Sequence, residues 1–176
     1  ELTDHLTKLR WVACGRYLYY AGRKNKFFNN CFLLRAEEDT REDWANLSWK
    51  AESCLMTGGG IGIDYSIYRP AGSALGGTGG TASGAVTKMR MINEIGRSVM
   101  QGGSRRSAIY ASLNWKHGDI QDFLNAKNWQ DMPVGNSGYT LFDAKQDDFN
   151  FPAPLDMTNI SVNYDTDWLL NYWRTG

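Results

Sequence analysis

Two adjacent arginines, Arg105 and Arg106, follow two glycines in the segment VMQGGSRRSAIYASL, residues 99–113. One glycine is enough to end a helix or form a short turn. Two glycines with two guanidinium groups suit a loop that changes shape and binds a phosphate or a base. Because residues 108–111 have the composition of a strand, the pattern predicts a binding loop between a helix and a strand.

A second candidate for anion binding is the glycine-rich stretch 70–82, PAGSALGGTGGTA. Its residues 77–82 match the pattern GxGxxA and precede a predicted helix, whose exposed N-terminal amides would suit phosphate. A dinucleotide fingerprint should follow its strand directly, whereas roughly ten loop residues intervene here. The stretch therefore keeps two interpretations, an ordinary flexible loop and an anion site.

Cys31 is a candidate for thiol chemistry, because Asn29 and Asn30 precede it at the start of the apolar run CFLL. A lone cysteine in an apolar strand is usually a small buried residue. A polar pair beside it would also suit the rim of an active site. Cys14 and Cys54 fall in apolar helical stripes, where we expect them to be packing residues.

Arg69 and Asp39 could bind two different parts of a nucleotide. Arg69 precedes Pro70 at the end of a predicted strand, and arginines on loops at strand ends favour anion recognition. Asp39 has two interpretations. It could cap the helix that follows it, or it could hold a ribose hydroxyl.

Composition limits the class of protein. The 176 residues suffice for one domain with a core, and 19 Lys+Arg balance 19 Asp+Glu, which argues against a broad nucleic-acid surface. Neither a membrane-spanning stretch nor a signal-peptide pattern is present. Three irregularly spaced cysteines do not suggest a disulfide framework. We therefore expect a cytoplasmic protein with no membrane partner and no structural metal.

The elements that would position these residues alternate between helices and strands. Helices are predicted over 1–14, 41–56, 84–100, from about 119 and over 165–173, and strands over 27–35, 61–67, 107–113 and 158–164. Thr40 with Asp43 matches a capping box, Ser83 is the expected N-cap of the helix over 84–100, and residues 128–157 are expected to be irregular. The alternation predicts an α/β fold with a largely parallel sheet.

Seven motifs occur in an order that resembles the catalytic (large) subunit of ribonucleotide reductases. They are GRYLYYAGR, NNCFLL, GGGIGIDYSIYRPAG, GGTGGTASG, QGGSRRSA, DIQDFLNAK and LDMTNISVN. Each is weak alone, but the ordered set is specific, and it looks most like the adenosylcobalamin-dependent class II enzymes. The resemblance implies that residues 1–176 are the N-terminal part of the catalytic barrel, a half barrel with two amphipathic dimerisation helices.

The resemblance assigns catalytic roles to Cys31 and Asn30. Cys31 would be half of the redox pair that reduces the substrate ribose, and Asn30 would lie beside the substrate, a ribonucleoside di- or triphosphate. In the family, a thiyl radical on another cysteine removes the 3′ hydrogen, and the 2′ hydroxyl leaves as water. The cysteine pair becomes a disulfide, which an external thiol such as thioredoxin reduces. The implied cofactor is adenosylcobalamin, with contacts mostly outside this stretch.

The resemblance also implies regulation by a deoxynucleoside triphosphate (dNTP). The QGGSRRS segment would relay the identity of the effector, with Gln101 and Arg105 reaching the substrate base. Arg69 would hold the effector phosphates and Asp39 its ribose, under a loop that includes Gly72 and Ser73. The helices over 41–56 and 84–100 would form a four-helix bundle across a homodimer. The strand runs into YRPAG without the long insertion of some monomeric class II enzymes, which favours this dimer-type site.

One departure from the family concerns the radical itself. The asparagine-cysteine-glutamate motif, which supplies the radical cysteine, is missing from the sequence, as are the second redox cysteine and the C-terminal phosphate-binding segment. We therefore expect a truncated or split catalytic chain that is inactive alone and is completed by the C-terminal remainder of the enzyme. The alternative is a non-catalytic, nucleotide-binding regulatory module, although such a module has no need of Cys31.

Overall fold

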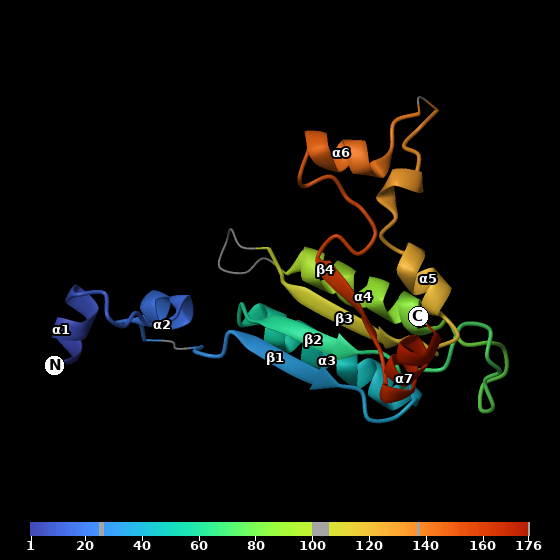
Figure 1. Ribbon diagram of the computed structural model, residues 1–176, viewed down its shortest axis with the longest axis horizontal. Helices are drawn as coiled ribbons and strands as arrows, with labels where there is room; N and C mark the ends of the chain where they lie inside the picture. The colour runs from blue at the N-terminus through green and yellow to red at the C-terminus, as the bar shows by residue number, and fades with distance from the viewer. Residues whose placement is uncertain (25–26, 100–105, 137, 176) are drawn as a thin grey trace.

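A four-stranded parallel sheet forms the centre of the chain (Figure 1). The computed structural model describes residues 1–24, 27–99, 106–136 and 138–175. The strands, in spatial as well as chain order, are β1 (Cys31–Arg35), β2 (Gly60–Asp64), β3 (Ile109–Asn114) and β4 (Thr158–Asn163). Parallel neighbours need crossover connections, usually helices. The predicted α/β architecture with a parallel sheet is confirmed.

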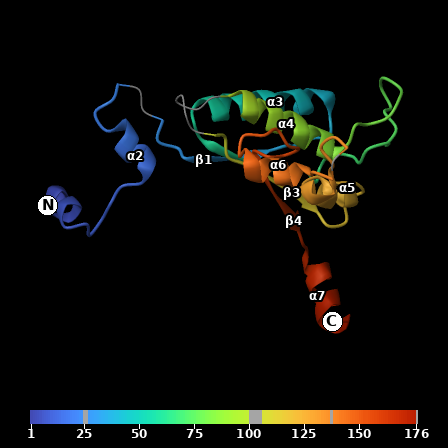
Figure 2. The ribbon, with the colours of Figure 1, turned by 90° about the horizontal axis from the view of Figure 1, so that it is seen from above.

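Two long helices cover one face of this sheet (Figure 2). Helix α3 (Arg41–Met56) connects β1 to β2, and α4 (Ala85–Ser98) connects β2 to β3. Their buried faces pack against the inward side chains of the strands, because alternate residues of a strand point to the same face. The core comprises Leu47, Ala51, Leu55, Ile61, Ile63, Met89, Ile92, Ile109, Ala111 and Leu113, among others.

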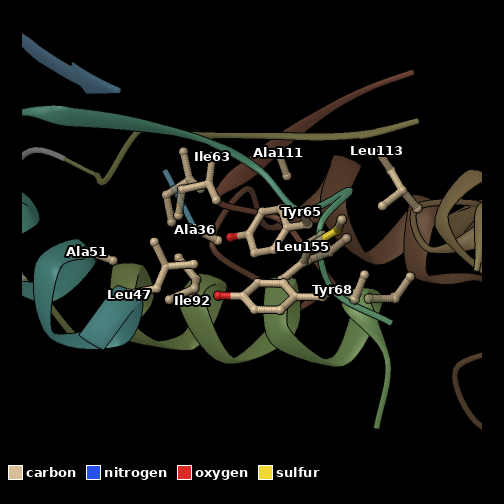
Figure 3. Close-up of a cluster of buried hydrophobic side chains, with 14 of the residues drawn as sticks. Ala36, Leu47, Ala51, Ile63, Tyr65, Tyr68, Ile92, Ala111, Leu113 and Leu155 are labelled. Atoms are coloured by element: carbon tan, nitrogen blue, oxygen red, sulfur yellow. The ribbon is translucent and has the colours of Figure 1, made fainter. Parts of the chain in front are cut away.

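The segment after β2 is anchored in this core. Tyr65 and Tyr68 are almost fully buried, and Figure 3 shows their rings between the sheet and helix α4. The ring of Tyr68 also meets that of Trp44 on α3 edge-on, with 5.0 Å between centroids. Large buried aromatic rings hold their backbone firmly, so the residue that follows, Arg69, starts from a fixed position.

The opposite face of β1 is open. Cys31, Leu33 and Arg35 are exposed, whereas the alternate residues Phe32 and Leu34 are half-buried and pack against the core. Leu33 is 87 % exposed, which is unusual for leucine in a strand. The exposed face of β1 therefore combines a thiol with apolar surface.

Several local predictions are wrong. The N-cap of helix α4 is Gly84 and not Ser83, so the cap residue has no side chain that could accept a hydrogen bond from the first turn. The buried carboxylate of Asp119 accepts the Ala85 N–H instead. The stretch 128–157 contains a 3₁₀ turn, η1 (Trp129–Asp131), and a helix, α6 (Leu141–Asp147). Thr140 and Asp143 form a capping box at the start of α6.

The ends of the chain also differ in detail from the prediction. The helix expected over 1–14 is the shorter α1 (Leu2–Thr7), and a separate α2 (Gly15–Tyr20) follows. Helices α5 (Ile120–Asn125) and α7 (Thr166–Thr175) lie where helices were expected. Figures 1 and 2 place α1 and α2 away from the sheet. Among the described residues, none of the helices has the length and apolar character needed to span a membrane.

Candidate functional site

Arg69 and Asp39 form an ion pair beside the glycine-rich loop. The Arg69 Nε lies 2.5 Å from Oδ2 of Asp39, its Nη2 donates to the Asp39 carbonyl at 3.0 Å, and its backbone N–H donates to the same carboxylate at 3.2 Å. The two side chains keep 37 % and 29 % of their surface exposed. An anion in solution can therefore reach the guanidinium.

The turn before α3 holds Asp39 in place. Thr40 caps the helix, because its Oγ1 accepts the Asp43 N–H at 3.2 Å. The Asp43 carboxylate accepts the backbone N–H groups of Glu37 and Glu38 at 3.1 and 3.4 Å. Asp39 is therefore not the helix cap, which was one of its two interpretations. Its carboxylate faces Arg69 instead.

The loop that contains Gly72 and Ser73 folds back on itself. The Gly72 N–H donates to the Ala82 carbonyl at 2.9 Å, and residues Ala74 and Thr81 form an isolated antiparallel bridge. Arg69 reaches this loop as well, because its Nη1 donates to the Ala74 carbonyl at 3.3 Å. The structure thus brings Arg69, Asp39, Gly72 and Ser73 into one region.

The GxGxxA pattern does not form a phosphate loop at a helix start. Gly79 and Gly80 both have positive φ, at +70° and +83°, and the Leu75 N–H donates to the Gly80 carbonyl at 3.0 Å. These residues lie at the tip of the arm, which is the part of the glycine-rich loop between the bridged residues Ala74 and Thr81. Glycine suits such a tip because it adopts positive φ without strain. Helix α4 starts only at Ala85.

Cys31 is exposed at the first position of β1. The side-chain amide of Asn30 contacts its sulfur at 3.9 Å, so the two residues that the sequence singled out are neighbours in space. A strand start allows this, because the chain is still turning there and does not yet alternate strictly. The interpretation of Cys31 as a small buried residue is wrong.

The other two cysteines differ from each other. Cys54 on α3 is half-buried and packs against the core, as expected, and burial raises the pKa of its thiol. Cys14 is exposed and is the N-cap of α2, so its assignment as a packing residue is wrong. A short helix that lies away from the sheet gives it nothing to pack against.

Gln101 and Arg105 lie outside the described residues, but the segment that follows them is described. Arg106 lies 3.5 Å from the Asp156 carboxylate, and its guanidinium stacks on Phe149 at 4.5 Å from the ring centroid. The fully buried Asp156 side chain also pairs with Arg97 at 2.9 Å and with Lys145 at 3.7 Å. Sequence reasoning missed Asp156, because a single acid before a strand gives no signal.

Lys88 is a second group that the sequence did not single out. It is fully buried between α3 and α4, where its Nζ donates to the Trp44 carbonyl and, at 2.6 Å, to the Ser48 hydroxyl. The Trp44 ring lies 4.7 Å from the same ammonium group. Burial lowers the pKa of Lys88 to about 8, since desolvation disfavours the charged form.

The apolar stripes of α3 and α4 are used inside the chain. The helix over 84–100 was expected at a dimer interface, but its apolar residues Met89 and Ile92 are buried in the core, at 1 % and 0 % exposure. The apolar faces of these helices are therefore not available for the homodimer contact that the resemblance implied. Large apolar side chains that do remain exposed on these helices are Trp49, Met56 and Met91.

Comparison with known proteins places this chain in a family. Residues 29–142, which include Cys31, Asp39, Arg69 and the loop, match the family described as ribonucleotide reductase, barrel domain. The chain belongs to the ribonucleotide reductase family. The matched range begins two residues before Cys31 and extends into α6.

Curated relatives of this reductase chain include enzymes with and without vitamin B12 in their names. It is 42 % identical over 122 residues to the vitamin B12-dependent ribonucleoside-diphosphate reductase of Mycobacterium tuberculosis, covering 69 % of this chain and 18 % of the relative. It is 34 % identical over 111 residues to the ribonucleoside-diphosphate reductase large chain of Schizosaccharomyces pombe, covering 62 % and 14 %.

A solved structure agrees at the level of the fold. The class Id ribonucleotide reductase alpha subunit of Actinobacillus ureae superposes with a TM-score of 0.64 at 15 % identity, over 92 % of this chain and 25 % of that one. The described sheet and helices thus correspond to part of a reductase barrel. The chain spans less than a fifth of the length of these curated relatives.

Proposed function

We propose that this chain is part of the catalytic subunit of a ribonucleotide reductase and carries both its dNTP specificity site and one redox cysteine. The observation that carries the proposal is the meeting of Arg69, Asp39 and the glycine-rich loop within the range matched to the barrel domain. Residues 30 apart in sequence come together there with partly exposed charged groups, which a nucleotide site needs.

At the specificity site, Arg69 would bind the effector phosphates and Asp39 the ribose hydroxyl. In the structure the Arg69 guanidinium is paired with the Asp39 carboxylate. A bound phosphate would take the place of this carboxylate as the anionic partner of Arg69. Bidentate contacts to phosphate suit arginine. The Gly72 backbone and the Ser73 hydroxyl would line the loop side, and Gln101 and Arg105 would carry the signal to the substrate base.

In the substrate site, Cys31 would supply reducing equivalents. Reduction of the ribose replaces its 2′ hydroxyl by hydrogen, releases water and oxidises two thiols to a disulfide. Cys31 would be one of the two thiols, with Asn30 beside the substrate, and an external reductant such as thioredoxin would restore both thiols. The exposure of Cys31 supports this role, because a thiol in exchange chemistry must be accessible.

The radical cysteine and most cofactor contacts would come from the C-terminal remainder of the enzyme. A pocket of about 540 Å³ lies between α4 and residues 152–155, and Cys31 does not line it. Assignment to class II, with adenosylcobalamin as the cofactor, rests on the names of the B12-dependent relatives.

Further partners follow from the same proposal. A homodimer would form through the outer faces of α3 and α4, placing the specificity site near the interface. We place the protein in the cytoplasm without a membrane partner, in keeping with its free cysteines, since reduced thiols persist there.

The proposal is tested by assaying the full-length protein with adenosylcobalamin, a dithiol reductant, and each ribonucleoside di- or triphosphate. Formation of deoxynucleotide that changes with the added dNTP would support it. Binding of dNTP without any product under all conditions would favour the alternative, a regulatory nucleotide-binding module. Absence of both binding and product would contradict both functions.

A further inference from the structure

The buried carboxylate of Asp119 joins the two ends of the glycine-rich loop. Its Oδ1 accepts the Ala71 N–H at 2.8 Å, and its Oδ2 accepts the Ala85 N–H at 2.8 Å. Asp119 is the N-cap residue of α5, but its side chain makes no capping bond to that helix. Both of its oxygens are directed to the loop ends.

The surroundings of Asp119 leave little freedom for this contact. A Cβ on Gly84 would lie 2.5 Å from the Asp119 Oδ2, and a Cβ on Gly118 would lie 2.7 Å from Pro70. Glycine at both positions thus permits the close approach. With only 6 % of Asp119 exposed, the two charge-assisted hydrogen bonds are shielded from water and correspondingly strong.

Asp119 is tied to the segment that carries Arg69. Its backbone N–H donates to Nδ1 of His117 at 3.0 Å, and Nε2 of His117 lies 2.6 Å from the Tyr68 carbonyl. Because that carbonyl can only accept, Nε2 carries the proton and His117 bridges the two segments. The residue before Arg69 and both ends of the loop are therefore held by residues 117–119.

Beyond its base, the arm has few supports. A Cβ added at Gly76, Gly77, Gly79 or Gly80 would meet no described atom within 4 Å. The direction of such an arm depends on how its two ends are fixed. Asp119 fixes both, and one of them, Ala71, lies two residues after Arg69.

We propose that Asp119 is a positioning residue for the dNTP site, because it orients the arm over Arg69 without touching the nucleotide. This inference rests on the proposed specificity site. Without the Asp119 carboxylate, the arm would sample more conformations, and a nucleotide would have to order the arm on binding. Asp119 would therefore set effector affinity.

The first test replaces Asp119 by asparagine in the full-length protein. Asp119→Asn retains one acceptor oxygen but presents an NH₂ group to one of the two backbone donors, so one end of the loop is released. Loss of one charge-assisted bond should weaken dTTP binding, measured by calorimetry, by about tenfold or more. Asp122→Asn is the matched control, because Asp122 is exposed on the same helix.

A second variant breaks the same contact from the loop side. The Ser73 N–H bonds to the Pro70 carbonyl at 3.2 Å, and Gly72 has φ +82°, which are features of a type II turn that accepts proline at its second position. Ala71→Pro therefore removes the donor to Asp119, and the proline Cδ that takes the place of the N–H also pushes the Asp119 carboxylate away from the loop. Hydrogen exchange should accelerate at the Gly72 and Ala82 amides and stay unchanged at Ile61 in the sheet.

The outcomes separate the inference from the proposed function. Weaker dTTP binding with local acceleration of exchange in either variant supports Asp119 as a positioning residue, and Ala71→Pro decides if Asp119→Asn does not fold. Affinities within twofold of wild type, or unchanged loop exchange, overturn it. Failure of the wild-type protein to bind any of the four dNTPs overturns the specificity site itself, and the positioning role with it.

Discussion

Cys31 pairs with Gly60 across the parallel strands β1 and β2, and a Cβ on Gly60 would lie 3.8 Å from the Cys31 sulfur. The glycine leaves one side of the thiol without a covering side chain. Two residues along, on the same face, Leu33 pairs with Gly62, so this face of β2 has no side chain at either position beside β1. Cys31 is thus exposed both because Gly60 on β2 has no side chain to cover it and because it lies at the start of β1.

This arrangement predicts the order in which the cysteines react. Cys31 should be alkylated by iodoacetamide faster than Cys54, which is half-buried and has a thiol pKa raised by burial, because the thiolate is the reactive form. Peptide mass spectrometry after short exposures measures each site. Equal rates in the native protein, or a faster Cys54, would contradict the exposed-thiol geometry; denatured protein provides the reference rates.

The redox role of Cys31 predicts a specific kinetic defect. In the full-length enzyme, Cys31→Ser should bind dNTPs as wild type does but lose multiple turnover, since serine cannot form the disulfide. Steady-state assays with excess reductant measure this loss, and Cys14→Ser is the matched control on an exposed cysteine outside the sheet. Repeated turnover by the Cys31 variant would remove it from the redox pair.

The ion pair between Arg69 and Asp39 predicts the effect of losing the guanidinium. Arg69→Ala should weaken dNTP binding by at least tenfold, because each charge-assisted hydrogen bond to phosphate contributes roughly 1.5–3 kcal/mol. Titration calorimetry measures the affinity. Arg41→Ala is the control, since Arg41 is 84 % exposed and pairs with its sequence neighbour Glu42. Equal affinities for the Arg69 variant and wild type would place the phosphate elsewhere.

Because the apolar stripes of α3 and α4 are buried in the core, a dimer through these helices would use the side chains on their outer faces. Trp49→Glu and Met91→Glu should convert a homodimer into monomers, because both side chains are exposed on these helices, at 67 % and 46 %. Met89→Glu should instead destabilise the fold, since it places a charge in the core. Light scattering measures the mass, and circular dichroism checks folding. A dimer that persists in both outer-face variants would require another surface.

The parallel sheet and its two long helices follow from local sequence signals. The apolar stripe of Trp44, Leu47, Ala51, Cys54 and Leu55 predicted the helix over 41–56, which is α3 with its observed bounds. The apolar run after Asn30 predicted β1. Periodic patterns of this kind predict long helices well, because the burial of one apolar face determines the structure of a long element. Short helices such as α6 carry no comparable stripe, so residues 128–157 were predicted to be irregular. The capping box of Thr140 and Asp143 was a local signal for the start of α6 that the prediction missed.

Contacts across the fold are harder to predict than elements. Asp119 replaces Ser83 at the start of α4 from 34 residues away, and no local pattern identifies such a cap. The burial of Asp156 and Lys88 likewise depends on which elements pack around them. For Arg69 and Asp39, sequence supplied two candidates, and only the fold of β2 and the turn before α3 shows that they meet.

Lys88 predicts how stability changes with pH. Its pKa is lowered by burial from 10.5 to about 8 in the folded chain, so between about pH 8 and 10.5 the unfolded state binds more protons than the folded state. The free energy of unfolding should therefore rise with pH in this window, because stability increases wherever the unfolded state holds the extra proton. Below pH 8 the lysine is charged in both states and its contribution is flat.

Substitution of Lys88 isolates this contribution from other groups. Burial raises the pKa values of Cys54, Tyr65 and Tyr68, which lowers stability at high pH in wild type and variant alike. The difference between wild type and Lys88→Met, from urea unfolding at pH 7 to 10, should therefore shift in favour of wild type by about 2–3 kcal/mol. Lys24→Met, at an exposed lysine, should show no such shift. A pH-independent difference for Lys88→Met would mean that the ammonium stays charged between α3 and α4, held by the Trp44 carbonyl and the Ser48 hydroxyl.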